Sequence, residues 1–130
     1  MAGIAPESEQ TPDLRDSAHL LICTRAALRL ITGKWKGEIM WNLKDGKHRF
    51  GELMRAIPGI TQHMLTAQLR DLERHGLLIR TVYAEVPPRV EYELTPAARD
   101  LRPVFEEINC WADRHAATLR LGEVDERDDT

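Results

Sequence analysis

Long hydrophobic runs are missing from this 130-residue sequence, in which the longest unbroken apolar stretch has four members, Leu20 to Cys23. A helix that spans a membrane needs about 18 or more apolar residues, so we expect no transmembrane segment. The first 16 residues also lack the basic start and apolar centre of a secretory signal peptide. We therefore expect a cytoplasmic protein whose two cysteines, Cys23 and Cys110, are free thiols.

The usual sequence motifs of enzymes and metal sites are absent as well. The five histidines form neither an H-x-x-x-H nor an H-E-x-x-H pattern, and the two cysteines are not spaced as C-x-x-C. The sequence contains no nucleophile elbow G-x-S-x-G, no Walker loop and no dinucleotide-binding G-x-G-x-x-G. We therefore predict that the protein is not an enzyme and that it binds no metal ion or other cofactor.

The composition, with 42% apolar and 30% charged residues, is typical of one globular domain. The charge is unevenly spread: residues 1–16 carry −3 and residues 121–130 carry −4, whereas residues 29–89 carry +5. We expect a disordered acidic N-terminal tail over 1–16, a folded domain over 17–120 and an acidic C-terminal tail over 121–130. The basic middle of the chain favours a phosphate-bearing partner.

Four segments in the first part of the domain repeat apolar residues at helical spacing, and each ends near a glycine. Ser17 and Thr61 stand where the first and fourth segments begin and can act as N-caps. In the fourth segment, Leu65, Leu69 and Leu72 fall on one face. The expected helices are 17–32, 35–45, 50–57 and 61–75.

After Gly76 the hydrophobic period changes to two, which is typical of β-strands. Residues 77–86 and 90–94 are expected to pair as a β-hairpin, because Pro87 and Pro88 between them cannot donate to a strand ladder. A last helix is predicted from Pro96 to Leu119, with Thr95 as its N-cap.

This order of elements, mainly α with a small β-hairpin, predicts a winged helix-turn-helix. In such modules the second helix of the pair enters the major groove of DNA, and the hairpin, or wing, reaches the neighbouring backbone. The polar face of segment 61–75 carries groups that can bond base edges or phosphates, although such a face can also be merely wetted. Its predicted contact residues are Gln62, His63, Thr66 and Arg70.

Basic residues outside that helix are further candidates for phosphate contact. Arg89, which is expected at the wing tip, is placed to meet a phosphate or a minor groove, or is a solubilising charge on an edge strand. Lys34, Lys36 and Arg49 flank the second helix and either contact phosphate or are merely exposed. Double-stranded DNA is therefore the predicted partner.

Several linked motifs over about residues 20–115 closely resemble the HxlR family of bacterial winged-helix regulators. The motifs are Cys23, AALRLITGKWK (26–36), RFGELMRAIPGIT (49–61), HMLTAQLRDLERHGLLIRTVY (63–83), PPRVEYELT (87–95) and Trp111.

The resemblance implies a homodimer, joined through the first and last helices, that binds an inverted-repeat operator as repressor or activator. It makes Thr61, Gln62 and His63 the leading residues of the recognition helix and Arg89 the wing residue. The last helix also has a longer apolar stripe than a small winged domain needs for its own core. The dimer residues expected are Leu21, Leu28, Phe105, Ile108 and Trp111.

Two positions depart from the family pattern. Members often have proline after the cysteine, where this chain has Thr24, and they commonly have lysine or arginine where this chain has His63. The latter change turns a permanent positive charge into a conditional one. Cys23 matches the cysteine with which some members detect oxidants or electrophiles, but a buried cysteine that only fills space is an equal alternative.

An alternative function is also open at this point. A winged-helix module that only contacts other proteins would need the same core but no polar helix facing a groove. Salt dependence separates the two functions, because binding led by phosphate contacts weakens steeply as the salt concentration rises.

Overall fold

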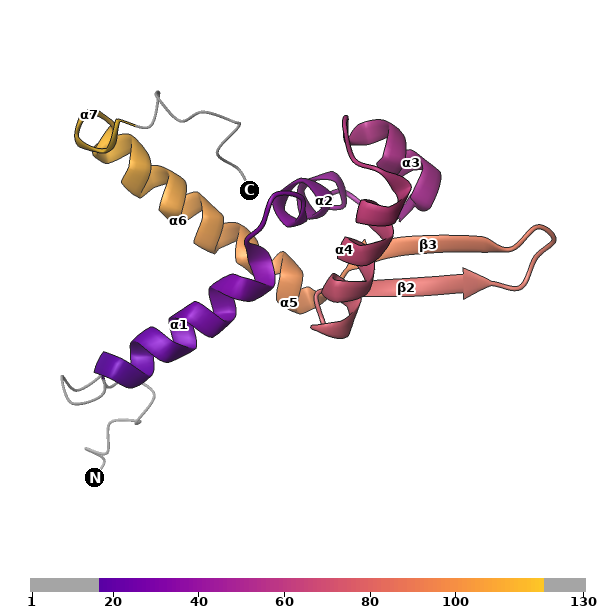
Figure 1. Cartoon of the computed structure of the whole chain (residues 1–130), viewed down its shortest axis with the longest axis horizontal. Helices are drawn as coiled ribbons and strands as arrows, with labels where there is room; N and C mark the ends of the chain where they lie inside the picture. The colour runs from indigo at the N-terminus through magenta and orange to yellow at the C-terminus, as the bar shows by residue number, and fades with distance from the viewer. Residues whose placement is uncertain (1–16, 121–130) are drawn as a thin grey trace. The chain divides into compact units, whose positions relative to one another are not determined.

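The computed structural model describes residues 17–120, so both predicted acidic tails, 1–16 and 121–130, lie outside the described residues (Figure 1). The chain divides into two compact units, residues 1–31 and residues 32–130. The elements are α1 (Ser17–Ile31), α2 (Lys36–Asn42), β1 (His48–Arg49), α3 (Phe50–Ala56), α4 (Gln62–Arg74), β2 (Leu78–Tyr83), β3 (Arg89–Leu94), α5 (Pro96–Arg99), α6 (Leu101–Arg114) and α7 (Ala116–Leu119).

The first unit contributes one described helix, α1, which confirms the predicted first helix. None of its residues is buried, and Leu20, Leu21, Ile22 and Leu28 are exposed. A helix with so many exposed apolar side chains has a surface that favours contact with another apolar surface.

The second unit begins with the helix-turn-helix, and the predicted helices over 35–45, 50–57 and 61–75 are confirmed as α2, α3 and α4. The turn between α3 and α4 contains Gly59, whose φ of +87° is unfavourable for residues with a side chain. Thr61 then caps α4 by accepting a hydrogen bond of 3.0 Å from the backbone N–H of Met64. Gly76, with φ +79°, follows the end of α4.

The strands β2 and β3 form the predicted hairpin, with register from Leu78 opposite Leu94 to Tyr83 opposite Arg89. The hairpin extends past α3 and α4 (Figure 1). A third strand, β1, was not expected; it pairs with β3 and gives the order β1-β3-β2. A strand of two residues is too short to show the alternation from which strands are predicted. The structure also places Arg89 inside β3, at its first residue, rather than at the tip of the connection.

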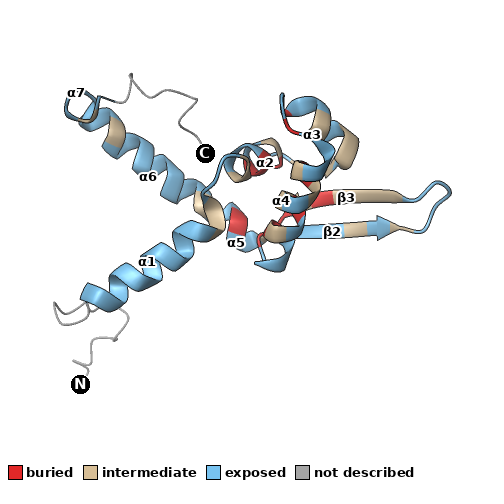
Figure 2. Cartoon of the chain, viewed as in Figure 1, coloured by how far each residue is buried: buried red, intermediate tan, exposed pale blue. Residues whose placement is uncertain are grey.

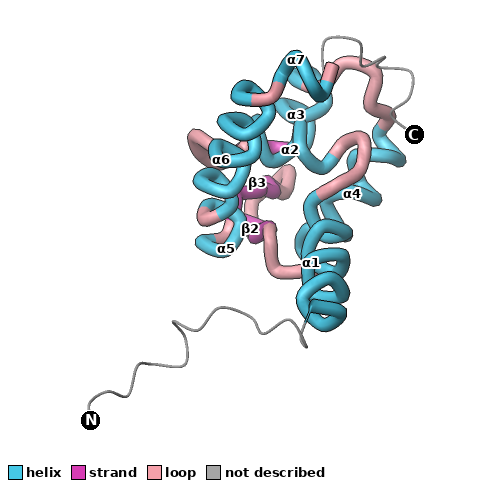
Figure 3. The backbone as a smooth tube through the Cα atoms, turned by 90° about the vertical axis from the view of Figure 1, so that its left-hand side faces the viewer, coloured by secondary structure: helices cyan, strands magenta, loops and turns pink. Residues whose placement is uncertain are grey.

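The core of the second unit lies where α2, α3 and α4 meet the base of the hairpin (Figure 2). Leu65, Leu69 and Leu72, predicted to share one face of α4, are all buried. Burial of each such side chain contributes about 1.5–3 kcal/mol. Helix α4 packs on β2 and α5 on β3, and Figure 3 shows the two strands between these helices. The recognition helix predicted from the sequence therefore has a fixed place against the sheet.

The predicted last helix is wrong as a single element, because it is divided into α5, α6 and α7. Pro103 explains the first break, at Asp100: proline has no N–H, and its ring clashes with the carbonyl four residues earlier. Helix α6 has no buried residue, and its large apolar side chains Val104, Phe105, Ile108 and Trp111 are exposed. Within residues 17–120, every helix is too short or too polar to cross a bilayer.

Candidate nucleic-acid interface

Helix α4 exposes a polar surface along the half that begins at the turn. Gln62, His63, Ala67 and Arg70 are exposed, and Thr66 is half-buried. Because the buried leucines of α4 recur every three or four residues, His63, Ala67 and Arg70 lie on the opposite side of the helix and Thr66 lies at its flank. Gln62, three residues before Leu65, lies on the same side as the leucines and is exposed as the first residue of the helix. Thr61 is exposed too, and its hydroxyl oxygen accepts the capping hydrogen bond. The O–H and the second lone pair of the oxygen are left for a ligand.

A small hollow of about 300 Å³ separates this surface of α4 from the sheet. Arg70 of α4 and Arg80 of β2 both line it, together with Thr66, Leu69, Glu73 and Tyr92. Two guanidinium groups beside one hollow favour an anionic partner at this place, since each can bond phosphate with two N–H groups. Sequence reasoning missed Arg80. Its position two residues after the apolar Leu78, on the same face of a strand next to the recognition helix, is a signal that could have found it.

Lys36 has a different place from the one the sequence predicted for it. Its Nζ lies 2.9 Å from Asp71 Oδ2 and donates a hydrogen bond of 3.0 Å to Gln68 Oε1. The Lys36 side chain is only 12% exposed, and its charge is satisfied inside the protein. The prediction that Lys36 is exposed is therefore wrong: this lysine ties α2 to α4. Its contact with a phosphate stays a prediction.

Asp71 is the centre of this contact. The hydrogen bond from Lys36 lowers the pKa of the Asp71 carboxyl below its ordinary value, even though partial burial opposes the shift. Arg74 and His75 add to the lowering from the end of α4. Asp71 is thus ionised at neutral pH and anchors the C-terminal half of the recognition helix.

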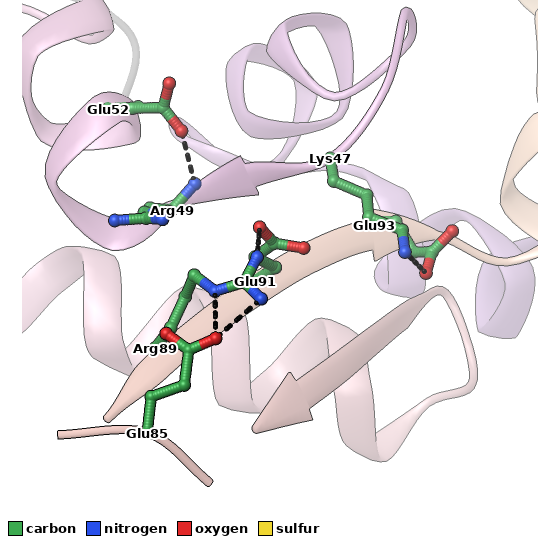
Figure 4. Close-up of polar contacts among 7 residues, drawn as sticks. All are labelled: Lys47, Arg49, Glu52, Glu85, Arg89, Glu91 and Glu93. Atoms are coloured by element: carbon green, nitrogen blue, oxygen red, sulfur yellow. Dashed lines mark hydrogen bonds and ion pairs between the residues drawn. The ribbon is translucent and has the colours of Figure 1, made fainter. Parts of the chain in front are cut away.

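Lys34 and Arg49 are exposed, as the sequence predicted. The Lys34 Nζ lies 5.1 Å from the centre of the Trp35 ring, which is a cation–π distance. The backbone N–H of Arg49 donates a hydrogen bond of 2.7 Å to Glu52, at the start of α3 (Figure 4). Neither basic side chain has a carboxylate within ion-pair distance among residues 17–120. Both charges are therefore available to an external anion.

Arg89 is held by two carboxylates at the base of the wing loop (Figure 4). Its Nη2 lies 2.9 Å from Glu85 Oε2, its Nη1 lies 2.8 Å from Glu91 Oε2, and its guanidinium carbon lies 3.9 Å from the centre of the Tyr83 ring. The hydrogen bonds to Glu85 and then Glu91 raise the pKa of Arg89 above its ordinary value. A phosphate would have to compete with these carboxylates for the guanidinium.

Lys47 and Glu93 form a second pair on the wing, 3.7 Å apart (Figure 4). Tyr83 first and Glu93 second raise the pKa of Lys47. The cations of the wing surface are therefore paired with carboxylates. The positive charge of this surface is smaller than Arg89 taken alone in the sequence indicated.

The candidate sensor cysteine lies on α1, the described helix of the first unit. Cys23 is exposed there, and its Sγ lies 3.5 Å from His19 Nε2, one turn earlier. Cys110 on α6 is exposed as well. Over residues 17–120, no three His, Cys, Asp or Glu side chains gather in a way that could hold a metal ion.

Known proteins resemble this chain over most of the domain. A family model described as HxlR-like helix-turn-helix matches residues 30–119. YdeP of Bacillus subtilis, described as an uncharacterized HTH-type transcriptional regulator, is 50% identical over 88 residues, which cover 68% of this chain and 69% of YdeP.

Solved structures of regulators are also similar to this chain. The redox regulator HypR in its reduced form has a TM-score of 0.66 and 44% identity, and the match covers 75% of this chain and 96% of HypR. Diamide-treated YodB from B. subtilis has a TM-score of 0.64 and 39% identity, with coverage of 69% and 89%. The family and fold predicted from the sequence are confirmed, and this family is not an enzyme class. The chain is a winged helix-turn-helix protein of the HxlR-like family of transcriptional regulators.

Proposed function

We propose that the protein is a homodimeric regulator that binds an inverted-repeat operator in double-stranded DNA. The observation that carries this proposal is the exposed polar half of α4, which directly follows a glycine turn and is held by buried leucines. A rigid helix with this surface suits insertion into a major groove. Such a function would place the protein in the cytoplasm, with the DNA.

We assign base reading to the beginning of α4. The amide of Gln62 can pair with adenine through two hydrogen bonds, and Arg70 with guanine or a phosphate. Thr61, His63 and Thr66 complete this surface, and Lys34, Arg49 and Arg80 add phosphate contacts around it. Arg89 contributes by exchanging a carboxylate partner for a phosphate.

The homodimer rests on apolar side chains that the chain leaves exposed. On α6, Val104, Ile108 and Trp111 are spaced by four and three residues, so they form one stripe along the helix. Phe105 lies beside the stripe, and Leu21 and Leu28 are exposed on α1. A two-fold dimer would present two recognition helices about 34 Å apart, which an inverted repeat requires.

The test compares Gln62→Ala with the unchanged protein on two DNAs. Genomic fragments captured by the protein are first sequenced to find the operator, and binding is then measured on the operator and on a scrambled duplex of equal length. We expect Gln62→Ala to lose about 1–3 kcal/mol on the operator and little on the scrambled duplex. Equal losses on both duplexes would contradict the role of Gln62 in base reading.

The alternative of a module that only contacts proteins is not favoured, because the curated relatives are described as transcriptional regulators. Salt titration tests this choice directly. Operator affinity should fall steeply as salt rises, with a slope set by the number of phosphates contacted. Affinity that does not change with salt would support the protein-contact alternative.

A redox response of Cys23 is a second element of the proposal. Two similar structures are of a redox regulator and of a diamide-treated protein, and Cys23 is exposed beside the imidazole of His19. The test treats the unchanged protein, Cys23→Ser and Cys110→Ser with diamide, measures operator binding and maps modified thiols by mass spectrometry. We expect Cys23→Ser alone to abolish the diamide effect; an unmodified Cys23 would contradict the response.

A further inference from the structure

A groove of about 650 Å³ lies in the second unit, between α2 and the segment formed by α5 and α6. This volume is within the range of sites that hold small organic molecules. Neither the helix-turn-helix contact nor the wing uses it. Its lining is Gly37, Met40, Trp41, Lys44, Leu94, Ala98, Arg99, Leu101, Arg102, Phe105, Glu106 and Asn109.

The floor of the groove is apolar and the walls include two aromatic rings. Met40, Leu94 and Ala98 are buried beneath it. Trp41 is 67% exposed and Phe105 is 41% exposed. Exposed aromatic surface next to an apolar floor favours a planar apolar ligand.

Three cations and one carboxylate line the same groove. Lys44 lies 4.1 Å from the Trp41 ring centre and 3.1 Å from Asp45, whose side chain is 78% exposed. Arg102 is paired with Glu106 at 3.2 Å.

Arg99 differs from the other two cations. Its Nη1 donates only a long hydrogen bond of 3.4 Å to the backbone carbonyl of Lys44. Throughout the part of the chain that the structure describes, no carboxylate lies within ion-pair distance of this guanidinium. An unmatched guanidinium at the rim of an apolar groove gives a carboxylate group of a ligand a defined partner.

We propose that this groove binds a small aromatic carboxylate, with its ring against Trp41 and Phe105 and its carboxylate on Arg99. The apolar floor rejects a strongly hydrated ligand, and the net positive lining favours an anion over a neutral molecule of the same shape. The proposal goes beyond DNA binding and does not depend on it.

Helix α1 of a second copy is a poorer occupant. Its charged side chains over residues 17–31 are Arg25 and Arg29, with no carboxylate among them. These like charges would oppose the cations of the groove. Of the apolar α6 residues assigned to the dimer, Phe105 also lines the groove, whereas the stripe Val104, Ile108 and Trp111 is absent from the lining. A second copy that binds this stripe therefore leaves the Trp41 and Arg99 side of the groove open.

The test uses the full-length protein without DNA and the probe 2-naphthoate, with the neutral 2-naphthalenemethanol as its matched comparison. Binding is followed by calorimetry and by the indole N–H signals of the three tryptophans in a ¹H–¹⁵N NMR spectrum. Trp41→Phe identifies the signal of Trp41. We expect 2-naphthoate to move that signal and leave the signal of Trp111 in place, and to bind about tenfold more tightly than the alcohol.

Arg99→Gln is the decisive variant, because Arg99 is exposed and its loss does not disturb the core. This variant should bind 2-naphthoate about tenfold more weakly and the alcohol with unchanged affinity. The control Arg114→Gln, which lies on the same segment but outside the groove, should change the affinity for neither probe. Equal affinity for both probes, or no effect of Arg99→Gln, would overturn the proposal. Dissociation of a dimer by 2-naphthoate in sedimentation velocity would also overturn the proposal. The probe would then displace a second copy of the chain from this surface, and the groove would be part of the dimer interface.

Discussion

Replacement of Lys36 by methionine tests whether this lysine is a structural tie or a DNA contact. The substitution keeps most of the apolar stem and removes the ammonium that bonds Asp71 and Gln68. Asp71 would then lose its principal partner while remaining partly enclosed. If the structural role is correct, the main loss is in the free energy of unfolding.

The size of the loss follows from the exposure of the two side chains, 12% for Lys36 and 24% for Asp71. Fully exposed ion pairs contribute about 0.2–1 kcal/mol, and breaking a fully buried pair costs about 3–5 kcal/mol. A pair between these limits should cost about 1–2 kcal/mol, which corresponds to a fall in Tm of roughly 4–10 °C for a domain of this size.

The assay is thermal and urea unfolding of Lys36→Met beside Lys34→Met, an exposed neighbour without a carboxylate partner among residues 17–120. Because the pKa of Asp71 is lowered in the folded state, its stabilising effect is complete above the ordinary pKa of about 3.9 and is lost as pH falls through the lower folded value. The difference between the unchanged protein and Lys36→Met should thus be constant from about pH 7 to 5 and shrink below about pH 4.

A DNA measurement completes the experiment. The slope of log affinity against log salt should be unchanged in Lys36→Met, since each phosphate contact that is lost lowers the slope by about 0.9. Equal Tm values for Lys36→Met and Lys34→Met, or a salt slope reduced by Lys36→Met, would refute the structural role of Lys36.

Three further predictions concern the wing, the recognition helix and the dimer. In a filter-binding assay, Arg89→Gln should weaken binding to the operator and to scrambled DNA by the same factor, because it also leaves the carboxylates of Glu85 and Glu91 free to repel phosphate. A loss of affinity for the operator alone would contradict this. His63→Lys should tighten operator binding, because lysine places a permanent positive charge on the exposed part of α4; an affinity that does not change would exclude a contact at this position. Ile108→Asp should give folded monomers in sedimentation velocity with weakened operator binding, and dimers that persist would contradict the role of α6.

The features that sequence reasoning predicted are those set by local spacing. The leucines at 65, 69 and 72 recur at helical intervals, so the buried face of α4 and its exposed opposite face could both be predicted. The break in the last helix was missed although it also has a local signal, Pro103, because proline removes an N–H and clashes with the preceding turn.

The side-chain contacts that were missed are ones that only the folded chain brings together. Lys36 looks like any exposed lysine until the fold brings Asp71, thirty-five positions later, to its ammonium. Arg89 looked free because both neighbouring glutamates could have pointed away from it, and only the hairpin geometry directs them onto its guanidinium. Side-chain pairing of this kind has no periodic signature in a sequence.

The short strand β1 has a mechanical consequence for the wing. It pairs with β3 only at Tyr92 and Glu91, so the middle of the hairpin is three-stranded, while Val90 and Arg89 beyond it belong to a two-stranded ribbon. Two-stranded ribbons twist more and are less stable on their own than wider sheets. The third strand therefore holds the hairpin in place beside the recognition helix, while the two-stranded tip can bend. The tip can then adapt to duplexes of different curvature without a change in the angle between the hairpin and the helix.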